Sequence, residues 1–427
     1  MKKIAVIGQG YVGLPLALEL SKYHPVIGFD INETRVEELN QSLDRTKEVD
    51  EKELDRAIDQ ARKTDFTLGY IASSQMEDLQ QAQIYIVTVP TPINEFNAPN
   101  LEPLRKASKM IAEYLSPGDI VIYESTVYPG CTEEECIPIL EEGSSMVLNR
   151  DFYVGYSPER IIPGDKVNTL TQIKKVTSGS CDFAAEEIDA LYRQIITAGT
   201  HKATSIKVAE ASKAIENAQR DVNISFINEL ALIFDRVGID TNEVLEAAGT
   251  KFNFLKYQPG LVGGHCISVD PYYLAHKAVQ LGYHPNVILS GRRVNDSIPE
   301  FVAAKVVKLM IQKNISVKDS KILILGVTFK ENCPDLRNTK IVDVYNELTQ
   351  YGATVGLYDP WADPKEVEKA FGTQLLPDIQ NEKYDAVILA VAHNEFFTID
   401  IEQITNSPSV VFDIKAKLNR DLVDARL

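Results

Sequence analysis

IAVIGQGYVGLPLALEL, residues 4–20, decides the fold of this chain. An apolar strand, Ile4–Ile7, runs directly into Gly8, Gly10 and Gly13, and an apolar helical stretch follows. In this G-x-G-x-x-G pattern the glycines permit a tight turn and let a pyrophosphate approach the N-terminus of a helix. Asp30 lies about twenty residues further on, at the end of the next strand, where a carboxylate can accept hydrogen bonds from ribose hydroxyls. The stretch therefore predicts a dinucleotide-binding Rossmann unit.

Asp30 also indicates which dinucleotide binds. Its charge repels a 2′-phosphate and so favours NAD over NADP. Arg35 complicates this prediction because a nearby arginine can pair with that phosphate, although its commoner role is a solvated charge on a helix face. A glycine-rich turn that binds no nucleotide is the alternative interpretation. The predicted cofactor contacts here are Gly8, Gly10, Tyr11, Val12, Gly13, Asp30 and Arg35.

Two further strand ends carry small polar residues beside proline, at residues 88–92 and 124–130. Ligands in this fold bind at the carboxyl edge of the sheet. Thr91 and Thr126 are therefore also predicted cofactor contacts, although helix capping or turn formation explains either threonine about as well.

Short apolar strands alternate with helical stretches, which is the pattern of a parallel sheet with helices on both faces. In the first half of the chain the predicted strands are Ile4–Ile7, Val26–Asp30, Ile84–Val89, Asp119–Glu124, Phe152–Tyr156 and Lys175–Thr177. A second series lies within residues 321–329, 354–360, 385–393 and 409–415. We therefore predict an α/β protein of two Rossmann-type, doubly wound lobes joined by a long central helix. The predicted domains are 1–200, 201–303 and 304–427.

Residues 205–237 carry apolar side chains at three- and four-residue steps, which predicts one long helix. These side chains are Ile215, Ala218, Val222, Phe226, Leu230, Ile233 and Val237. Such a helix often packs against a second subunit, which would make the protein a homodimer, but a plain spacer between domains has the same periodicity. Tyr283–Pro285 and the region near Ile298–Pro299 are turn-like breaks and candidate boundaries of the second lobe.

Composition excludes several classes of partner. A net charge of -17 argues against nucleic acid, which needs a basic face, whereas a small anion can still bind at a helix N-terminus. The first residues show no signal peptide and no run of about 18 apolar residues occurs, so we expect no membrane contact. The five cysteines show no zinc spacing, so no metal is predicted, and their odd number suggests reduced thiols in a cytoplasmic protein.

The segment PGLVGGHCISVDPYY, residues 259–273, contains the candidate catalytic residues. Cys266 follows two glycines and a histidine, and Asp270 lies in the same segment. Because glycines let a substrate approach the backbone and N–H groups near the thiol can stabilise an oxyanion, we favour a nucleophilic Cys266 over a packing residue. His265 either activates this thiol or points elsewhere in the loop, and both alternatives stay open.

Polar residues on two other segments could reach the same site. Lys213, Asn217 and Arg220 share one face of the predicted long helix, where a solvated surface is the alternative explanation. Glu159 and Arg160 follow the strand at 152–156, and a carboxylate at this position could activate water.

In sequence order and over essentially the whole chain, the motifs resemble those of the UDP-glucose/GDP-mannose dehydrogenase superfamily. The matching segments are GQGYVGLPLA (8–17), VPTPIN (89–94), ESTVYPG (124–130), YSPERIIPGD (156–165), EASKAIENAQRDVN (210–223), GGHCISVDPYY (263–273), GRRVND (291–296) and FKENCPDLRNT (329–339). The cysteine loop, VPTPIN and YSPERIIPGD look like the UDP-N-acetylhexosamine 6-dehydrogenases of bacterial surface-polysaccharide synthesis, such as the Vi-antigen and O-antigen branch. They look less like the UDP-glucose branch.

This resemblance implies NAD-dependent oxidation of the C6 alcohol of UDP-N-acetylglucosamine or UDP-N-acetylgalactosamine to the uronate. Cys266 would capture the intermediate aldehyde as a thiohemiacetal and carry it on to a thioester. Removing four electrons needs a two-electron carrier twice, and a covalent thiol adduct keeps the aldehyde bound between the two steps. No step requires a metal.

The resemblance also assigns roles to individual residues. Lys213 and Asn217 would steady the developing oxyanion and line the substrate, Asp270 would hold a water or proton relay, and Glu159 would assist thioester hydrolysis. The C-terminal domain would bind the UDP-sugar. Further substrate contacts would be Arg160, Ile161, Arg220, Gly263 and Lys330, and Arg337 would touch the cofactor. Where relatives carry an arginine before the cysteine loop, this chain has KFNFLK (251–256), so its pyrophosphate contact differs.

Three alternatives remain at this point. UDP-glucose or UDP-N-acetylmannosamine would be oxidised by the same mechanism, and an apolar pocket separates such sugars weakly. A two-lobed hydroxyacid dehydrogenase would transfer a single hydride and would not need Cys266. A non-catalytic NAD-binding protein would need neither Cys266 nor the polar face of the long helix.

Overall fold

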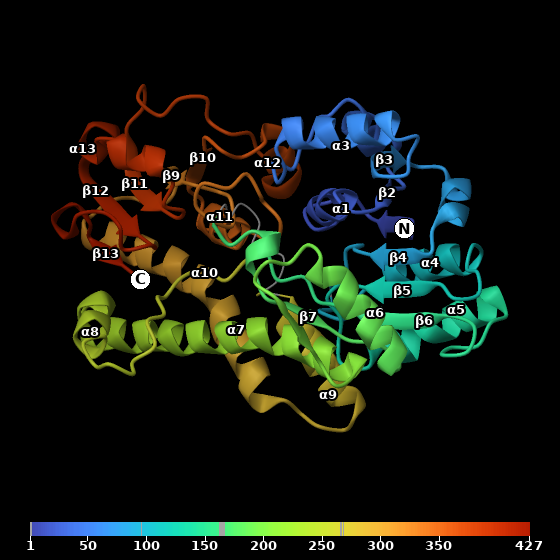
Figure 1. Ribbon diagram of the computed structural model, residues 1–427. Coiled ribbons are helices and arrows are strands. Elements are labelled where there is room, and N and C mark those ends of the chain that lie inside the picture. The colour runs from blue at the N-terminus through green and yellow to red at the C-terminus, as the bar shows by residue number, and fades with distance from the viewer. Residues whose placement is uncertain (1, 95, 162–166, 265–266, 268) are drawn as a thin grey trace. The chain divides into compact units, whose positions relative to one another are not determined.

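The computed structural model describes residues 2–94, 96–161, 167–264, 267 and 269–427. The chain divides into two compact units (Figure 1). The first unit comprises Met1–Glu216 with Tyr272–Tyr283, and the second comprises Asn217–Pro271 with His284–Leu427. Among the described residues, no helix combines the length and the apolar character needed to cross a bilayer.

The first unit is built on a six-stranded parallel sheet in the order β3-β2-β1-β4-β5-β6. Its strands are β1 (Ile4–Ile7), β2 (Pro25–Phe29), β3 (Gly69–Ser73), β4 (Ile84–Val87), β5 (Ile120–Tyr123) and β6 (Tyr153–Tyr156). This order is that of the dinucleotide-binding fold, whose ligand crevice opens beyond the carboxyl ends of β1 and β4. β3 was not predicted, because its sequence GYIAS contains the glycine and serine that are typical of turns.

Helices and a small parallel sheet of β7 (Lys175–Thr177) and β8 (Thr200–Lys202) surround these strands. The helices are α1 (Gly13–Ser21), α2 (Glu33–Asn40), α3 (Glu51–Lys63), α4 (Glu102–Ala112), α5 (Ile137–Ser144) and α6 (Asp182–Arg193). In α3 the Asp50 side chain caps the first turn, and the apolar face of Leu54, Ala57 and Ile58 packs into the core of the sheet. Local caps and one apolar stripe therefore suffice to define this helix.

The predicted long helix is α7 (Ile206–Val237), and α8 (Thr241–Ala248), α9 (Asp270–Gln280) and α10 (Asn286–Gln312) follow it. The break predicted near Ile298–Pro299 is wrong, because α10 continues through Pro299. Ile298, Val302 and Val306 are fully buried in the core of the second unit, and this packing outweighs the hydrogen bond that proline removes. α10 therefore crosses the predicted domain boundary at residue 303 without interruption.

The second unit contains a five-stranded parallel sheet in the order β10-β9-β11-β12-β13. The strands are β9 (Lys321–Leu325), β10 (Thr354–Tyr358), β11 (Tyr384–Leu389), β12 (Thr405–Asp413) and β13 (Ala425–Arg426), with helices α11 (Ile341–Gln350), α12 (Pro364–Phe371) and α13 (Ile401–Ile404). Ile322 and Ile324 pack into one core, and Leu323 and Leu325 pack into another. Both faces of the sheet are therefore buried, as in other doubly wound folds.

The predicted fold class is confirmed in both units, with one refinement. The second sheet follows the strand order 2-1-3-4-5, the other common doubly wound arrangement, and its topological switch point lies between β9 and β11. Ligands in such sheets bind beyond the carboxyl ends of the strands at the switch point. The segments that follow β9 and β11 are therefore the first places to look for a site in this unit.

Candidate active site

Glycine has a different structural role at each of the three positions of the first turn. Gly8 has a φ of +96°, in the region that L side chains rarely adopt. A Cβ on Gly13 would lie 1.8 Å from the Gly8 carbonyl oxygen, so α1 can pack this closely against the turn only with glycine there. A Cβ on Gly10 would meet nothing within 4 Å. The open side of the turn is therefore at Gly10, where a pyrophosphate would approach.

The surroundings of this turn fit a dinucleotide. α1 begins at Gly13 with Val12 at its N-cap, no side chain caps its N–H groups, and its first turn contains no acidic residue, so an anion is favoured there. Tyr11 and Val12 are half-buried beside it. Asp30 is half-buried and accepts backbone hydrogen bonds from Gln9 at 2.8 Å and from Asn32 at 2.9 Å. These two bonds fix the carboxylate at the strand end where a ribose would bind.

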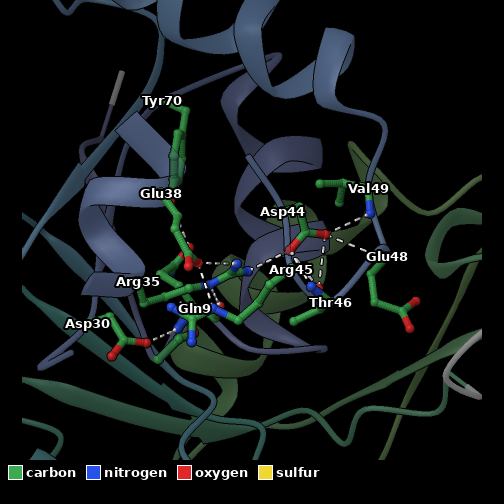
Figure 2. Close-up of polar contacts among 11 residues, drawn as sticks. Gln9, Asp30, Arg35, Glu38, Asp44, Arg45, Thr46, Glu48, Val49 and Tyr70 are labelled. Carbon is green, nitrogen blue, oxygen red and sulfur yellow. Dashed lines mark hydrogen bonds and ion pairs between the residues drawn. The ribbon is translucent and has the colours of Figure 1, made fainter. Parts of the chain in front are cut away.

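Arg35 corrects one of our predictions. It is not a solvated helix-face charge, because its side chain is only 5% exposed (Figure 2). Its Nε donates to the Gln9 carbonyl at 2.9 Å, and its Nη2 pairs with Asp44 at 2.8 Å. Arg35 thus contacts the glycine turn at Gln9, the residue whose N–H binds Asp30, and the buried carboxylate of Asp44 neutralises its charge.

Asp44 is the centre of the segment between α2 and α3. It accepts hydrogen bonds from Arg35, from the backbone and hydroxyl of Thr46, and from the backbone N–H groups of Glu48 and Val49 (Figure 2). Burial alone would raise the pKa of Asp44, but the hydrogen bonds from Thr46 and Arg35 hold that pKa below its ordinary value. Asp44 therefore remains ionised and ties this segment to Arg35.

Thr91 and Thr126 lie together at the carboxyl edge of the first sheet. The Thr91 hydroxyl donates to the Thr126 carbonyl at 2.7 Å, and the Thr91 carbonyl accepts from the Tyr273 hydroxyl at 2.9 Å. The first bond links the segments after β4 and β5 and agrees with the turn-forming role that we considered for these threonines. Thr126 is half-buried, and whether either residue contacts a cofactor stays a prediction.

Glu159 is part of a buried charge cluster that the sequence did not reveal. One of its oxygens accepts the N–H groups of Arg160 and Ile161 at 2.6 and 2.7 Å, and the other pairs with Lys175 at 3.1 Å. Lys175 in turn pairs with Glu124 at 2.7 Å, and Glu124 also accepts a hydrogen bond from the Tyr192 hydroxyl. Residues from β5, β6, β7 and α6, or immediately beyond their ends, are joined in this way.

The cluster sets the charge on Glu159. Burial would raise the pKa of Glu159, but the Lys175 ammonium and the two backbone N–H groups hold it below its ordinary value. Burial raises the pKa of Glu124 to about 7, although Lys175 opposes the change. Burial would lower the pKa of Lys175, and its two carboxylate partners raise it instead. Glu159 is therefore an ionised carboxylate with both oxygens already hydrogen-bonded.

The neighbours of Glu159 have partners within the first unit. Arg160 pairs with Glu216 of α7 at 2.7 Å and donates to the Lys174 carbonyl at 2.7 Å. Ile161 packs partly against the core and borders a cavity of about 210 Å³. Leu18, Val49 and Leu170 also line this cavity.

Two residues predicted at the chemical centre are in contact. The Asn217 side-chain amide donates to Asp270 at 2.5 Å, and both residues are buried in the second unit. Lys213 is buried one helical turn before Asn217 in α7, whereas Arg220 is exposed. The predicted polar face of the long helix is therefore solvated at Arg220 but not at Lys213 or Asn217.

Cys266 and its neighbour His265 lie outside the described residues. The glycines before them pack tightly within the second unit: a Cβ on Gly263 would lie 2.6 Å from the Asn338 carbonyl oxygen, and Gly264 has a φ of +87°. A small cavity of about 20 Å³ adjoins this segment, lined by residues that include Leu261, Gly263, Phe329, Glu331, Lys340, Val391 and Lys415. Within the described ranges, no cluster of three or more metal-ligating side chains could hold an ion.

Lys330 and Arg337 also belong to the second unit. Lys330 is half-buried in the segment after β9, next to Phe329 of the cavity. Arg337 is exposed and pairs with Asp335 through two nitrogens. Its predicted contact with the cofactor stays a prediction.

Some residues that organise the site were not predicted. Gln9, inside the glycine motif, is fully buried, accepts from the Tyr70 hydroxyl at 3.0 Å and donates to the Val6 carbonyl. Lys175 begins a strand and is followed by Val176, and a lysine buried in such a strand needs a carboxylate partner. That position was the one available signal for the cluster around Glu159.

Comparison with known proteins covers nearly all of the chain. Profiles of the UDP-glucose/GDP-mannose dehydrogenase family match residues 2–196 as its NAD binding domain, 207–297 as its central domain and 323–420 as its UDP binding domain. The UDP-N-acetyl-D-glucosamine 6-dehydrogenases of Pseudomonas aeruginosa and Salmonella typhi are 54% and 53% identical over 100% of this chain and 99% and 98% of theirs. The solved UDP-D-ManNAc dehydrogenase of Pyrococcus horikoshii matches with a TM-score of 0.87 and 28% identity, covering 99% of this chain and 98% of that one.

Proposed function

Because this chain belongs to the UDP-glucose/GDP-mannose dehydrogenase family, we propose that it oxidises the C6 alcohol of UDP-N-acetylglucosamine to the carboxylate with NAD as acceptor. The observation that carries the choice of sugar is the identity above 50%, over the full length, to two relatives named for this activity. UDP-N-acetylgalactosamine, its C4 epimer, is the second candidate, and surface-polysaccharide synthesis is the proposed use of the product.

The residues of the first turn fit NAD. The open turn at Gly10, the uncapped start of α1 and the fixed carboxylate of Asp30 suit a pyrophosphate and a ribose without a 2′-phosphate. When bound there, NAD supplies the hydride acceptor for both oxidation steps. Thr91, Thr126 and Arg337 complete the proposed cofactor contacts.

The protein's own groups would handle the sugar. Cys266 would add to the C6 aldehyde as a thiolate, giving a thiohemiacetal whose oxidation leaves a thioester, and water would then release the acid and the thiol. Buried Lys213 and the Asn217–Asp270 pair would stabilise the negative oxygen and hold a water or proton near it. Arg160, Ile161, Arg220, Gly263 and Lys330 are the remaining proposed substrate contacts.

Glu159 would act on the water that hydrolyses the thioester. Its depressed pKa makes it a weak base but a permanent negative charge at neutral pH. We therefore propose that it orients the attacking water through a hydrogen bond and does not keep the proton that this water loses.

The proposal extends to domains and assembly. We propose an NAD domain at 1–200, a central domain at 201–303 and a UDP-sugar domain at 304–427. A homodimer through α7 is supported by the apolar stripe of that helix, where Phe226 is 57% exposed and Ile233 and Val237 are also exposed. A cytoplasmic location is supported by the four described cysteines, which are free thiols as expected in a reducing compartment.

The test is turnover of a panel of UDP-sugars with NAD, followed by product masses and NADH yield. The expected result is two NADH per UDP-N-acetylglucosamine and a uronate, without free aldehyde. Higher kcat/KM for UDP-glucose than for both acetamido sugars would contradict the sugar, and a preference for UDP-N-acetylmannosamine would contradict the sugar but not the mechanism. One NADH per sugar would contradict the mechanism and favour a single-hydride dehydrogenase.

A further inference from the structure

The second unit repeats the turn that binds the dinucleotide in the first. In each unit the glycine after the first strand has a positive φ, +96° at Gly8 and +91° at Gly326. Each of these glycines donates its N–H to the last residue of the neighbouring strand, Gly8 to Phe29 at 2.8 Å and Gly326 to Tyr358 at 2.9 Å. The backbone of the two turns is therefore built in the same way.

The acid that follows the second strand is also repeated, but its surroundings differ. Asp30 accepts the N–H of Gln9 at 2.8 Å, and Asp359 accepts the N–H of Val327 at 2.7 Å. Asp30 is half-buried, which leaves room for a ribose, whereas Asp359 is only 6% exposed. His393 covers Asp359, with its Nε2 3.1 Å from the carboxylate. The acid of the second unit therefore holds a side chain of the protein where the first would hold a ligand.

The hydrogen bonds of His393 determine its protonation. The imidazole is completely buried, and its Nδ1 accepts the backbone N–H of Asn332 at 2.8 Å. Nδ1 therefore carries no hydrogen, and the proton sits on Nε2, facing Asp359 and the Thr328 hydroxyl at 3.1 Å each. The Thr328 hydroxyl passes its own hydrogen to the Lys330 carbonyl at 3.0 Å. His393 thus lies between a carboxylate and a loop and bonds to both.

That loop, residues 328–332, is anchored by His393 at both ends. Thr328 bonds to Nε2 and Asn332 to Nδ1, so a single imidazole spans the loop. Between these anchors lie Phe329 and Glu331, which line the small cavity beside Gly263, and Lys330. The loop follows β9 and His393 follows β11, so the cluster lies at the switch point of this sheet, where ligands bind.

We propose that Asp359 and His393 form a positioning pair that holds the loop 328–332, and with it Lys330, in the conformation that binds the UDP half of the substrate. Asp359 fixes the tautomer and orientation of His393, and His393 fixes both ends of the loop. Neither residue touches the ligand in this scheme. The proposal rests on the proposed function, because it takes the ligand of this unit to be the UDP group.

Two substitutions of His393 distinguish the hydrogen bond made by Nδ1 from those made by Nε2. His393→Asn keeps an acceptor near the position of Nδ1 and so can still bind the Asn332 N–H. His393→Gln places an amide near the position of Nε2, keeps the contact with Asp359 and leaves the Asn332 N–H without its partner. A buried N–H that loses its acceptor is costly, so only the glutamine variant should release the end of the loop.

The measurement is the Kd for UDP, determined by calorimetry on the full-length protein, together with KM and kcat for the UDP-sugar. We expect His393→Gln to raise the Kd for UDP and the KM by about tenfold or more, with kcat at saturation and the Kd for NAD changed less than about threefold. His393→Asn should recover most of the affinity. Equal losses in both variants, no loss in either, or an equal loss of NAD affinity would overturn the proposal.

Two further variants keep the test decisive. Thr328→Val keeps nearly the same shape and removes the hydrogen bond to the Lys330 carbonyl. It should weaken UDP binding, and it can be measured even if His393→Gln does not fold. Unchanged UDP affinity in Thr328→Val would contradict the proposed role of the loop. In a Lys330→Met background, His393→Gln should add little further loss, because the contact that it positions is already gone, and fully additive effects would overturn the coupling. If the wild-type protein neither binds UDP nor oxidises UDP-sugars, the proposed function fails, whereas UDP binding that is insensitive to His393 refutes only the positioning pair.

Discussion

Replacing Asp44 by asparagine should weaken the preference for NAD over NADP. Asp44 neutralises Arg35, whose guanidinium lies behind the turn that carries Asp30 and also donates to the Gln9 carbonyl at 2.9 Å. As long as Asp44 is ionised, the ion pair holds the Arg35 guanidinium in this position. Asparagine keeps one acceptor oxygen and the shape of the side chain but removes the charge. The guanidinium then becomes available to a 2′-phosphate bound beside Asp30.

The size of the effect follows from the contact that is lost. A hydrogen bond to a charged partner contributes about 1.5–3 kcal/mol, and a neutral one about half of this. The difference of roughly 1 kcal/mol corresponds to about a fivefold rise in the ratio of kcat/KM for NADP to that for NAD. NAD should remain the better cofactor because Asp30 still repels the phosphate. Asp44→Ala is less informative, since an unpaired buried charge costs about 3–5 kcal/mol of stability.

The assay is kcat/KM for both cofactors at low ionic strength, where the interaction with the phosphate is least screened. Asp59→Asn is the matched control, because it makes the same change of charge on the half-exposed surface of α3, where Asp59 pairs with Arg62 and Lys63. It should leave the cofactor ratio unchanged. An unchanged ratio in Asp44→Asn, or an equal change in both variants, would show that the Arg35–Asp44 pair does not govern the choice of cofactor.

Three further predictions concern the nucleophile, the subunit contact and the pH dependence of stability. Cys266→Ala should abolish uronate formation while sparing part of the first oxidation, and Cys266→Ser should accumulate a sugar ester visible by mass spectrometry; uronate production at a near-normal rate by the alanine variant would rule out a nucleophilic thiol. Phe226→Glu should shift the protein from dimer to monomer in analytical ultracentrifugation, because a charge replaces an exposed apolar side chain on α7, and an unchanged mass would place the interface elsewhere. Burial raises the pKa of Glu210, which accepts the N–H groups of Gly130 and Thr132, to about 7. Its contribution to stability is therefore complete below about pH 4.5 and lost as the pH rises through about 7, so Glu210→Gln should flatten the fall in Tm over this range, and an identical slope in both proteins would contradict the assignment.

The fold could be predicted wherever the local pattern was stronger than the tertiary context. The glycine turn, the apolar strands and the periodicity of α7 each depend on residues close in sequence, and each was confirmed. Two of the departures from the prediction, at β3 and at α10, have opposite reasons. β3 has turn-like residues but is held between β2 and α3, and α10 contains Pro299 but is held by a fully buried face. In both, packing against neighbours overrides the intrinsic preference of the chain.

The candidate site was harder to predict because its charges are paired over long distances in the sequence. Asn217 and Asp270 were both named, yet their hydrogen bond joins residues 53 apart in the sequence and could not be predicted. Glu159 was named without Lys175, which lowers its pKa, and without Glu124, which pairs with the same lysine. Hydrogen-bond partners of this kind leave no periodic trace, since the strands and loops that bring them together lie far apart in the chain.

The two sheets show why one ligand site could be predicted and the other only by resemblance. In the first unit the ligand meets the backbone directly, so glycine is required and its spacing is visible in the sequence. In the second, Gly326 repeats the turn with its positive φ, and a Cβ there would also lie 2.5 Å from Val391. Both the backbone conformation and the packing therefore require this glycine, and no G-x-G-x-x-G follows it. The acid that would mark a ribose site, Asp359, is covered by His393. The site that we propose in this unit depends on side chains of the loop after β9, and a lysine or phenylalanine in such a loop has no distinctive spacing.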